Sequence, residues 1–209
     1  RGEAGLIHPM TQPDEAPDLD VAYKLETPDA SRRLYRDWAM TYDQTFAADR
    51  GYEYPAGIAA LFDERAGALD QPVLDVGCGT GLVAEKLATH PIDGVDISPE
   101  MLSEARRKAV YRDLIEGDLT ARLPIDDGVY GGFISAGTFT HGHVGPDALD
   151  ELARIAKPGA LFALGVNAEV FQTLNFRDKL DAMVEEGVIS QPEITSRPIY
   201  RDDADHDHA

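Results

Sequence analysis

The chain has 209 residues, of which 43% are hydrophobic, and its 38 acidic and 19 basic residues give a formal net charge of −19. The length and composition suit one globular domain, whereas the acid excess disfavours DNA or RNA as a substrate, because nucleic-acid affinity comes from neutralising phosphates with basic side chains. No apolar run approaches the roughly 20 residues of a membrane helix, no secretory signal opens the chain, and the single cysteine excludes an intrachain disulfide, so we expect a cytoplasmic protein.

The first part of the chain divides into an extension and two predicted helices. Residues 1–26 are rich in Pro, Asp, Glu and Gly without a hydrophobic period, and we expect partial disorder there. Thr27-Pro28 is typical of a helix start, and a helix over 28–46 places Tyr35, Trp38 and Tyr42 on one stripe. A second helix is predicted over 55–66.

From residue 73 onward, apolar strand patterns alternate with helix patterns, which predicts an α/β fold with a doubly wound, mostly parallel sheet. The expected strands lie near 73–76, 92–95, 113–117, 131–136 and 160–166. Ser98-Pro99 and Gly145-Pro146 are predicted to begin helices, and Lys157-Pro158-Gly159 to form the turn into the fifth strand. A helix near 176–186 and a strand near 193–200 complete a single domain over 27–200, and 201–209 form an acidic polar tail.

A glycine-rich turn follows the first predicted strand. Val73–Val76 lead into three glycines spaced two apart, Gly77, Gly79 and Gly81, and an amphipathic segment that reads as a helix start follows from Leu82 to Ala88. Such a turn lets the backbone approach a ligand closely. Asp96 ends the second strand 21 residues after Asp75, a distance that suits a ribose hydroxyl pair, and Asp118 ends the third, where a carboxylate can accept from an adenine amino group. We therefore expect an adenosine-containing cofactor.

A nicotinamide dinucleotide is one alternative. Its fingerprint, G-x-G-x-x-G, requires a third glycine where this chain has Leu82, and neither Gly81 nor Asp118 is expected at such a site. A nicotinamide-dependent oxidoreductase remains an alternative, as does a non-catalytic protein that only binds the cofactor.

Taken together, these segments resemble class I S-adenosylmethionine-dependent methyltransferases. Two further segments, 34–43 and 137–146, are similar to the methyltransferase-like proteins of the Williams–Beuren region, and the resemblance covers roughly 27–167. It implies a Rossmann-like methyltransferase fold with the N-terminal helices as a lid. That sheet usually ends with a sixth strand and an antiparallel seventh, and the polar 201–209 cannot supply the last one. The resemblance also implies the cofactor-binding residues: Asp75, Gly77, Cys78, Gly79, Thr80, Gly81, Asp96, Ile97, Met101, Asp118, Leu119, Ser135, Ala136, Trp38 and Tyr42.

The expected reaction is methyl transfer from S-adenosylmethionine to a small-molecule acceptor by in-line displacement, with S-adenosylhomocysteine as the product. The acceptor should lie beside the loop 135–144, after the fourth strand. Ser135 there disfavours amino-group enzymes with an Asn/Asp-Pro-Pro-Tyr motif and metal-dependent catechol-type enzymes, so no metal is expected. His141 and His143 are the candidate bases, since an imidazole accepts a proton near neutral pH, although a role in shaping the loop is the simpler interpretation.

Overall fold

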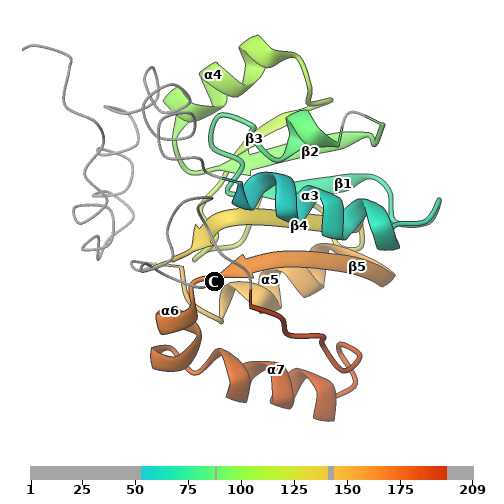
Figure 1. Cartoon of the computed structure of the whole chain (residues 1–209), viewed down its shortest axis with the longest axis vertical. Coiled ribbons are helices and arrows are strands. Elements are labelled where there is room, and N and C mark those ends of the chain that lie inside the picture. The colour runs from blue at the N-terminus through green and yellow to red at the C-terminus, as the bar shows by residue number, and fades with distance from the viewer. Residues whose placement is uncertain (1–52, 88, 141–143, 197–209) are drawn as a thin grey trace, which may run out of the picture.

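A five-stranded parallel sheet organises the protein in a computed structural model, which describes residues 53–87, 89–140 and 144–196 (Figure 1). The strand order is β3-β2-β1-β4-β5. The strands are β1 Val73–Val76, β2 Ile92–Asp96, β3 Leu114–Glu116, β4 Tyr130–Phe139 and β5 Ala156–Val166. Asp75 of β1 is paired with Gly94 of β2 on one side and with Ile134 of β4 on the other. The order reverses between β1 and β4, and in such sheets ligands bind beyond the carboxyl ends of the strands at the reversal.

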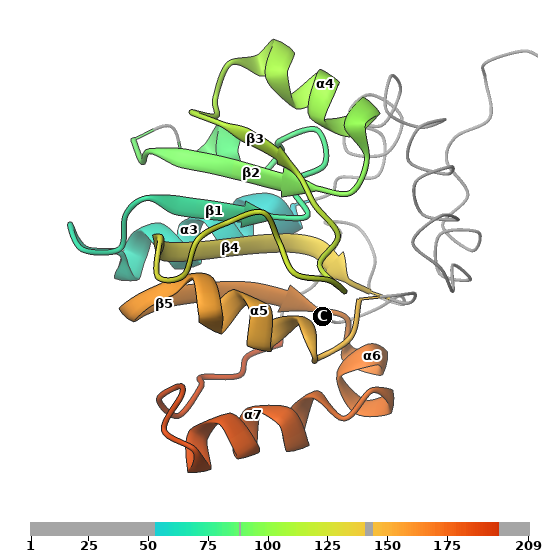
Figure 2. The same cartoon turned by 180° about the vertical axis from the view of Figure 1, so that it is seen from behind.

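Helices cover both faces of the sheet. α3 packs on β4 and β5 on the face toward the viewer in Figure 1, and α5 lies on the opposite face, as Figure 2 shows from behind. α6 and α7 lie beyond β5. The helices are α3 Tyr54–Arg65, α4 Pro99–Lys108, α5 Ala148–Ile155, α6 Ala168–Thr173 and α7 Phe176–Glu185. This confirms the predicted doubly wound α/β fold. None of the described helices combines the length and apolar character that crossing a bilayer requires.

The start of α4 confirms the predicted cap. The hydroxyl of Ser98 accepts a hydrogen bond from the backbone N–H of Met101 at 3.2 Å, and Pro99 occupies the first helical position, where its missing N–H costs nothing. Ser98 is fully buried. This cap fixes where the chain turns after β2, next to the carboxyl end of the sheet.

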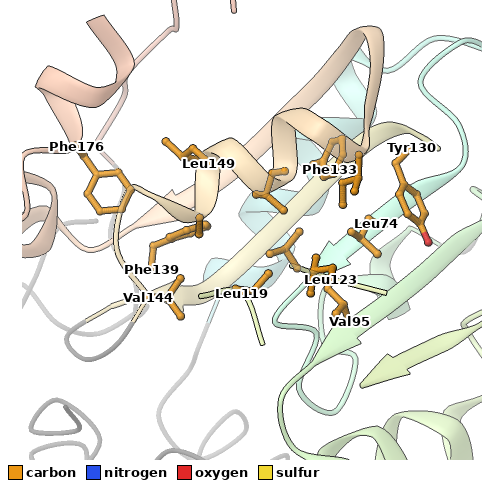
Figure 3. Close-up of a cluster of buried hydrophobic side chains, with 14 of the residues drawn as sticks. Leu74, Val95, Leu119, Leu123, Tyr130, Phe133, Phe139, Val144, Leu149 and Phe176 are labelled. Atoms are coloured by element: carbon orange, nitrogen blue, oxygen red, sulfur yellow. The ribbon is translucent and has the colours of Figure 1, made fainter. Parts of the chain in front are cut away.

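The main hydrophobic core lies between the sheet and α5 (Figure 3). Phe133 of β4 stacks on Phe162 of β5 with ring centroids 4.3 Å apart. The predicted stripe of α5 is buried throughout: Ala148, Leu149, Leu152 and Ile155. A second cluster on the opposite face joins Ile58 and Phe62 of α3 to Val73 of β1. Both faces of the central strands are therefore sealed from water.

Several local predictions are wrong. The segment after Gly81 forms only a short 3₁₀ turn, Ala84–Lys86, rather than the start of an α-helix. Lys157-Pro158-Gly159 lies within β5 rather than in a turn before it. Tyr130 of β4 pairs with Ala156 and Gly132 with Leu161, so β5 carries extra residues between these two pairs as an irregularity in the register. The helix α6 was not predicted, although Asn167 caps it by accepting from the N–H groups of Glu169 and Val170.

The end of the predicted domain also differs. Residues 193–196 belong to no strand, so the described part of the expected strand 193–200 is absent. The predictions for 1–26, for the helix 28–46 and for the tail 201–209 lie outside the described residues.

The buried stripe of α5 makes a direct test of the core. Leu152→Ala removes a fully buried side chain and should lower the free energy of unfolding by about 2–5 kcal/mol, whereas Asp150→Ala on the exposed side of the helix removes only a surface ion pair with Lys179 and should cost less than about 1 kcal/mol. Urea unfolding measures both. Equal losses would show that this face of α5 is not the core.

Candidate functional site

The turn after β1 is held against β4 and remains open on its other side. Gly77 has a φ of +64°, and a Cβ there would collide with the side chain of Thr138. Gly79 has a φ of +51°, and a Cβ there would meet nothing within 4 Å. The N–H of Cys78 donates to the carbonyl of Val95 in β2 at 3.0 Å, which ties the turn to the neighbouring strand. The backbone at Gly79 is thus fixed and faces open space, as close approach of a ligand requires.

Asp96 links this turn to the start of α4. One carboxylate oxygen accepts from the N–H of Gly79 at 2.8 Å, and the other accepts from the N–H of Ser98 at 2.9 Å. Burial raises the pKa of Asp96 above its ordinary value, and these backbone donors partly offset the rise. A carboxylate offers about four lone-pair sites, so Asp96 keeps room for hydroxyl donors.

Asp118 follows β3 at the same edge of the sheet. One of its oxygens accepts from the N–H of Thr120 at 2.9 Å and from its hydroxyl at 2.7 Å. The other has no hydrogen-bond partner among the described residues, and the neighbouring Leu119 is buried. The parallel register pairs Asp96 with Glu116, two residues before Asp118. The tertiary structure therefore brings the turn, Asp96 and the Asp118 segment to the carboxyl ends of adjacent strands.

Asp75 and Tyr111 form a buried pair beneath the turn. Asp75 is 1% exposed, and one of its oxygens accepts the hydroxyl of Tyr111 at 2.7 Å. Burial raises the pKa of Asp75 to about 7, although the Tyr111 hydrogen bond lowers it and the nearby Asp96 raises it. Tyr111 was not predicted to lie at the site, because in the sequence it is an ordinary residue between a helix and a strand. No pattern marks it, because its partner lies 36 residues away.

Other residues expected at the cofactor site serve the scaffold through their side chains. Ser135 is fully buried, and its hydroxyl donates to the carbonyl of Val76 at 2.7 Å, where Thr138 also donates at 2.8 Å. Cys78 is buried, and burial raises the pKa of its thiol, so it packs as a neutral side chain. The side chain of Met101 is buried in α4.

The remaining predicted site residues are either buried, partly exposed or outside the described part of the chain. Thr80 is buried within the turn, whereas Ile97 and Ala136 are partly exposed near the strand ends. Trp38, Tyr42, His141 and His143 lie outside the described residues, so the lid and the candidate bases stay predictions. Within 53–87, 89–140 and 144–196, no group of three or more His, Cys, Asp or Glu side chains is arranged to hold a metal ion.

Comparison with known proteins agrees with this geometry. A family model described as "Methyltransferase domain" matches residues 74–164. The human methyltransferase-like protein 27 is 32% identical over 184 residues, which cover 79% of this chain and 73% of that protein. The DhpI structure, in complex with SAH (S-adenosylhomocysteine), shares 26% identity with a TM-score of 0.52 and covers 65% of this chain and 67% of its own.

Matches to enzymes with named acceptors are shorter. The bovine 18S rRNA (guanine-N(7))-methyltransferase is 43% identical over 70 residues, which cover 32% of this chain and 25% of that enzyme. The demethylmenaquinone methyltransferase of Chlorobaculum tepidum is 34% identical over 137 residues, which cover 61% of this chain and 55% of that enzyme.

The two glycines provide a matched test of the turn. Gly77→Ala and Gly79→Ala each place a methyl group on a residue in the left-handed region, which should lower the free energy of unfolding by about 1–2 kcal/mol. Only at Gly77 does the added methyl group also collide with Thr138. Gly77→Ala should therefore destabilise the protein clearly more in urea unfolding. Equal destabilisation would mean that the turn does not press against β4 as described.

Proposed function

Since the chain belongs to the class I S-adenosylmethionine-dependent methyltransferases, we propose that it methylates a small-molecule acceptor. Methyl transfer from S-adenosylmethionine is the chemistry of the family, and membership excludes the nicotinamide-dependent oxidoreductase considered above. The observation that carries the cofactor assignment is the joint placement of the glycine turn, Asp96 and Asp118 at neighbouring strand ends.

The residues present fit the methyl donor. Gly79 leaves open space above the turn, where the methionine portion can approach the backbone. Asp96 retains lone pairs for ribose hydroxyls, and Asp118 retains an oxygen for the adenine amino group. A fully buried oxygen of Asp75 has no hydrogen-bond partner, which suits a polar group of the ligand near the turn. We propose these contacts for the cofactor-binding residues.

The chain's own contribution is alignment and exclusion of water. When bound, S-adenosylmethionine supplies a methyl group on a sulfonium, which an acceptor takes by in-line displacement. Holding the reactants in line can lower a barrier by about 7–11 kcal/mol, so no universal catalytic side chain is required. His141 and His143, which follow β4 in the sequence, are proposed as bases for an acceptor that carries a proton, and Trp38 and Tyr42 are proposed to cover the donor.

Charge supports a small acceptor over a nucleic acid. The formal net charge of −19 opposes binding to a phosphate backbone, and the residues at the end of β4, Ser135 to Thr138, lack the Asn/Asp-Pro-Pro-Tyr motif of many nucleobase amino-group enzymes. An rRNA acceptor is the second candidate, because the rRNA-modifying relative is the more similar over its short overlap. The demethylmenaquinone methyltransferase matches over a longer part of the chain and favours the small molecule.

Ligand binding and turnover test the proposal separately. Calorimetry should show saturable binding of S-adenosylhomocysteine and none of NAD at the same concentration. A screen of small metabolites with radiolabelled donor should then yield a labelled product, while rRNA yields none. Labelled rRNA would reverse the choice of acceptor, and donor binding without transfer to any acceptor would favour a non-catalytic binding protein.

Asp96 can be tested against a neighbouring acid. Asp96→Asn leaves one acceptor oxygen where two are used and removes the charge that should hold the ribose, so affinity for S-adenosylhomocysteine should fall at least about tenfold. Glu116→Gln removes the same charge at the register-paired position of β3 and should change the affinity less than about twofold. Calorimetry on both variants, after urea unfolding has verified their stability, measures the difference. Unchanged affinity in Asp96→Asn would place the ribose elsewhere.

A further inference from the structure

The carboxyl group of Asp75 is buried, and only one of its two oxygens has a hydrogen-bond partner within the described structure. One oxygen accepts from Tyr111 at 2.7 Å, and the other is buried without a hydrogen-bond partner. Leaving a buried acceptor unpaired is costly, and it is tolerated chiefly where a ligand or a water completes the site. The unpaired oxygen lies two residues before Gly77, at the base of the turn proposed to hold the methyl donor.

Tyr111 reaches this carboxyl because two glycines leave room for its ring. Positions that a Cβ would take at Gly81 and Gly94 lie 3.0 Å and 3.1 Å from the ring of Tyr111. Gly94 is the residue of β2 paired with Asp75, and Gly81 is the last glycine of the turn. The ring therefore lies across β2 beside the turn, and its hydroxyl donates to the carboxyl group of Asp75 in β1.

The charges around Asp75 lack a positive partner among the described residues. Three titratable groups interact electrostatically with Asp75 so that one affects the pKa of the other: Tyr111, Asp96 and the thiol of Cys78. Of these, Tyr111 stabilises the carboxylate by donating to it, whereas Asp96 and burial disfavour the charged form. Burial and the carboxylate also raise the pKa of the Tyr111 phenol, so it remains a donor throughout the neutral range.

We propose that Tyr111 is a positioning residue for the methyl donor: its hydroxyl orients and helps to ionise the Asp75 carboxyl, and its ring supports the glycine turn from beneath. This inference rests on the proposed function, since it assumes that the donor's methionine portion, which carries a cationic ammonium, lies beside the turn. The ionised carboxylate then attracts the ammonium, and without Tyr111 the carboxyl takes up a proton more readily.

The sign of the pH effect follows from that hydrogen bond. Removing a donor to the carboxylate raises the pKa of Asp75 from about 7, so a smaller fraction is ionised below pH 8. Tyr111→Phe keeps the ring and loses only the hydroxyl. Its affinity for S-adenosylhomocysteine should be about tenfold weaker than that of the unaltered protein at pH 6, where a rise of one pKa unit acts in full, and less than about twofold weaker at pH 8.5.

A second tyrosine–aspartate pair supplies the matched control. Tyr130 donates to Asp93 at 2.9 Å, but this carboxylate is also held by two hydrogen bonds from Arg112 and lies toward the amino end of β2. Tyr130→Phe should leave both the affinity for S-adenosylhomocysteine and its pH dependence unchanged. Asp75→Asn, which has no carboxyl to titrate, should be weakened at every pH and lose the pH dependence between 6 and 8.5 that Asp75 causes.

Calorimetric titration of the four proteins with S-adenosylhomocysteine from pH 6 to 8.5 distinguishes the outcomes. If Tyr111→Phe equals the unaltered protein at every pH, or is weakened equally at every pH, Tyr111 does not act through the ionisation of Asp75 and the inference is overturned. Should Tyr111→Phe unfold, the pH dependence of the unaltered protein and its loss in Asp75→Asn still decide whether the carboxyl titrates. Failure of the unaltered protein to bind at any pH would instead overturn the proposed function.

Discussion

The structure depends on how the chain leaves β1. The turn must pass close enough to β4 that Thr138 occupies the space beside Gly77, and it must leave the backbone open at Gly79. Both positions have a positive φ, which only glycine adopts without strain. Asp96 then fixes the turn by accepting from Gly79 while it also accepts from Ser98 at the start of α4. One carboxylate thus couples the end of β1, the end of β2 and a helix cap.

Two buried aspartates on neighbouring strands differ in how far their charge and hydrogen bonding are compensated by the surrounding side chains. Asp93 accepts two hydrogen bonds from Arg112 and one from Tyr130, so a cation lies beside it and both of its oxygens have partners. Asp75 is more deeply buried, accepts only from Tyr111 and has no cation beside it in the described structure. The arrangement at Asp93 stabilises the fold, whereas the unpaired oxygen of Asp75 is the reason we propose a role for this residue in binding the donor.

Strand alternation made the fold predictable, and the acid positions indicated which edge of the sheet to propose for the cofactor. The five strands, the cap at Ser98 and the buried stripe of α5 follow from local periodicity and capping, because these signals need only neighbouring residues. The same reasoning failed where local and tertiary preferences compete. The segment after Gly81 has a helical pattern but winds only into a 3₁₀ turn, and the Lys157-Pro158-Gly159 sequence, typical of a turn, is absorbed as an irregularity within β5.

The sequence by itself determined the parallel sheet, the glycine turn and the order of the acids at the strand ends, since each arises from spacing along the chain. Only the tertiary structure decided what each side chain does. It directs the hydroxyl of Ser135 to the carbonyl of Val76, and it brings Tyr111 across β2 to a carboxyl 36 residues away. The gap at Gly94 and the burial of Asp75 exist only once β1, β2 and the turn are packed together, so no local pattern could reveal that pair.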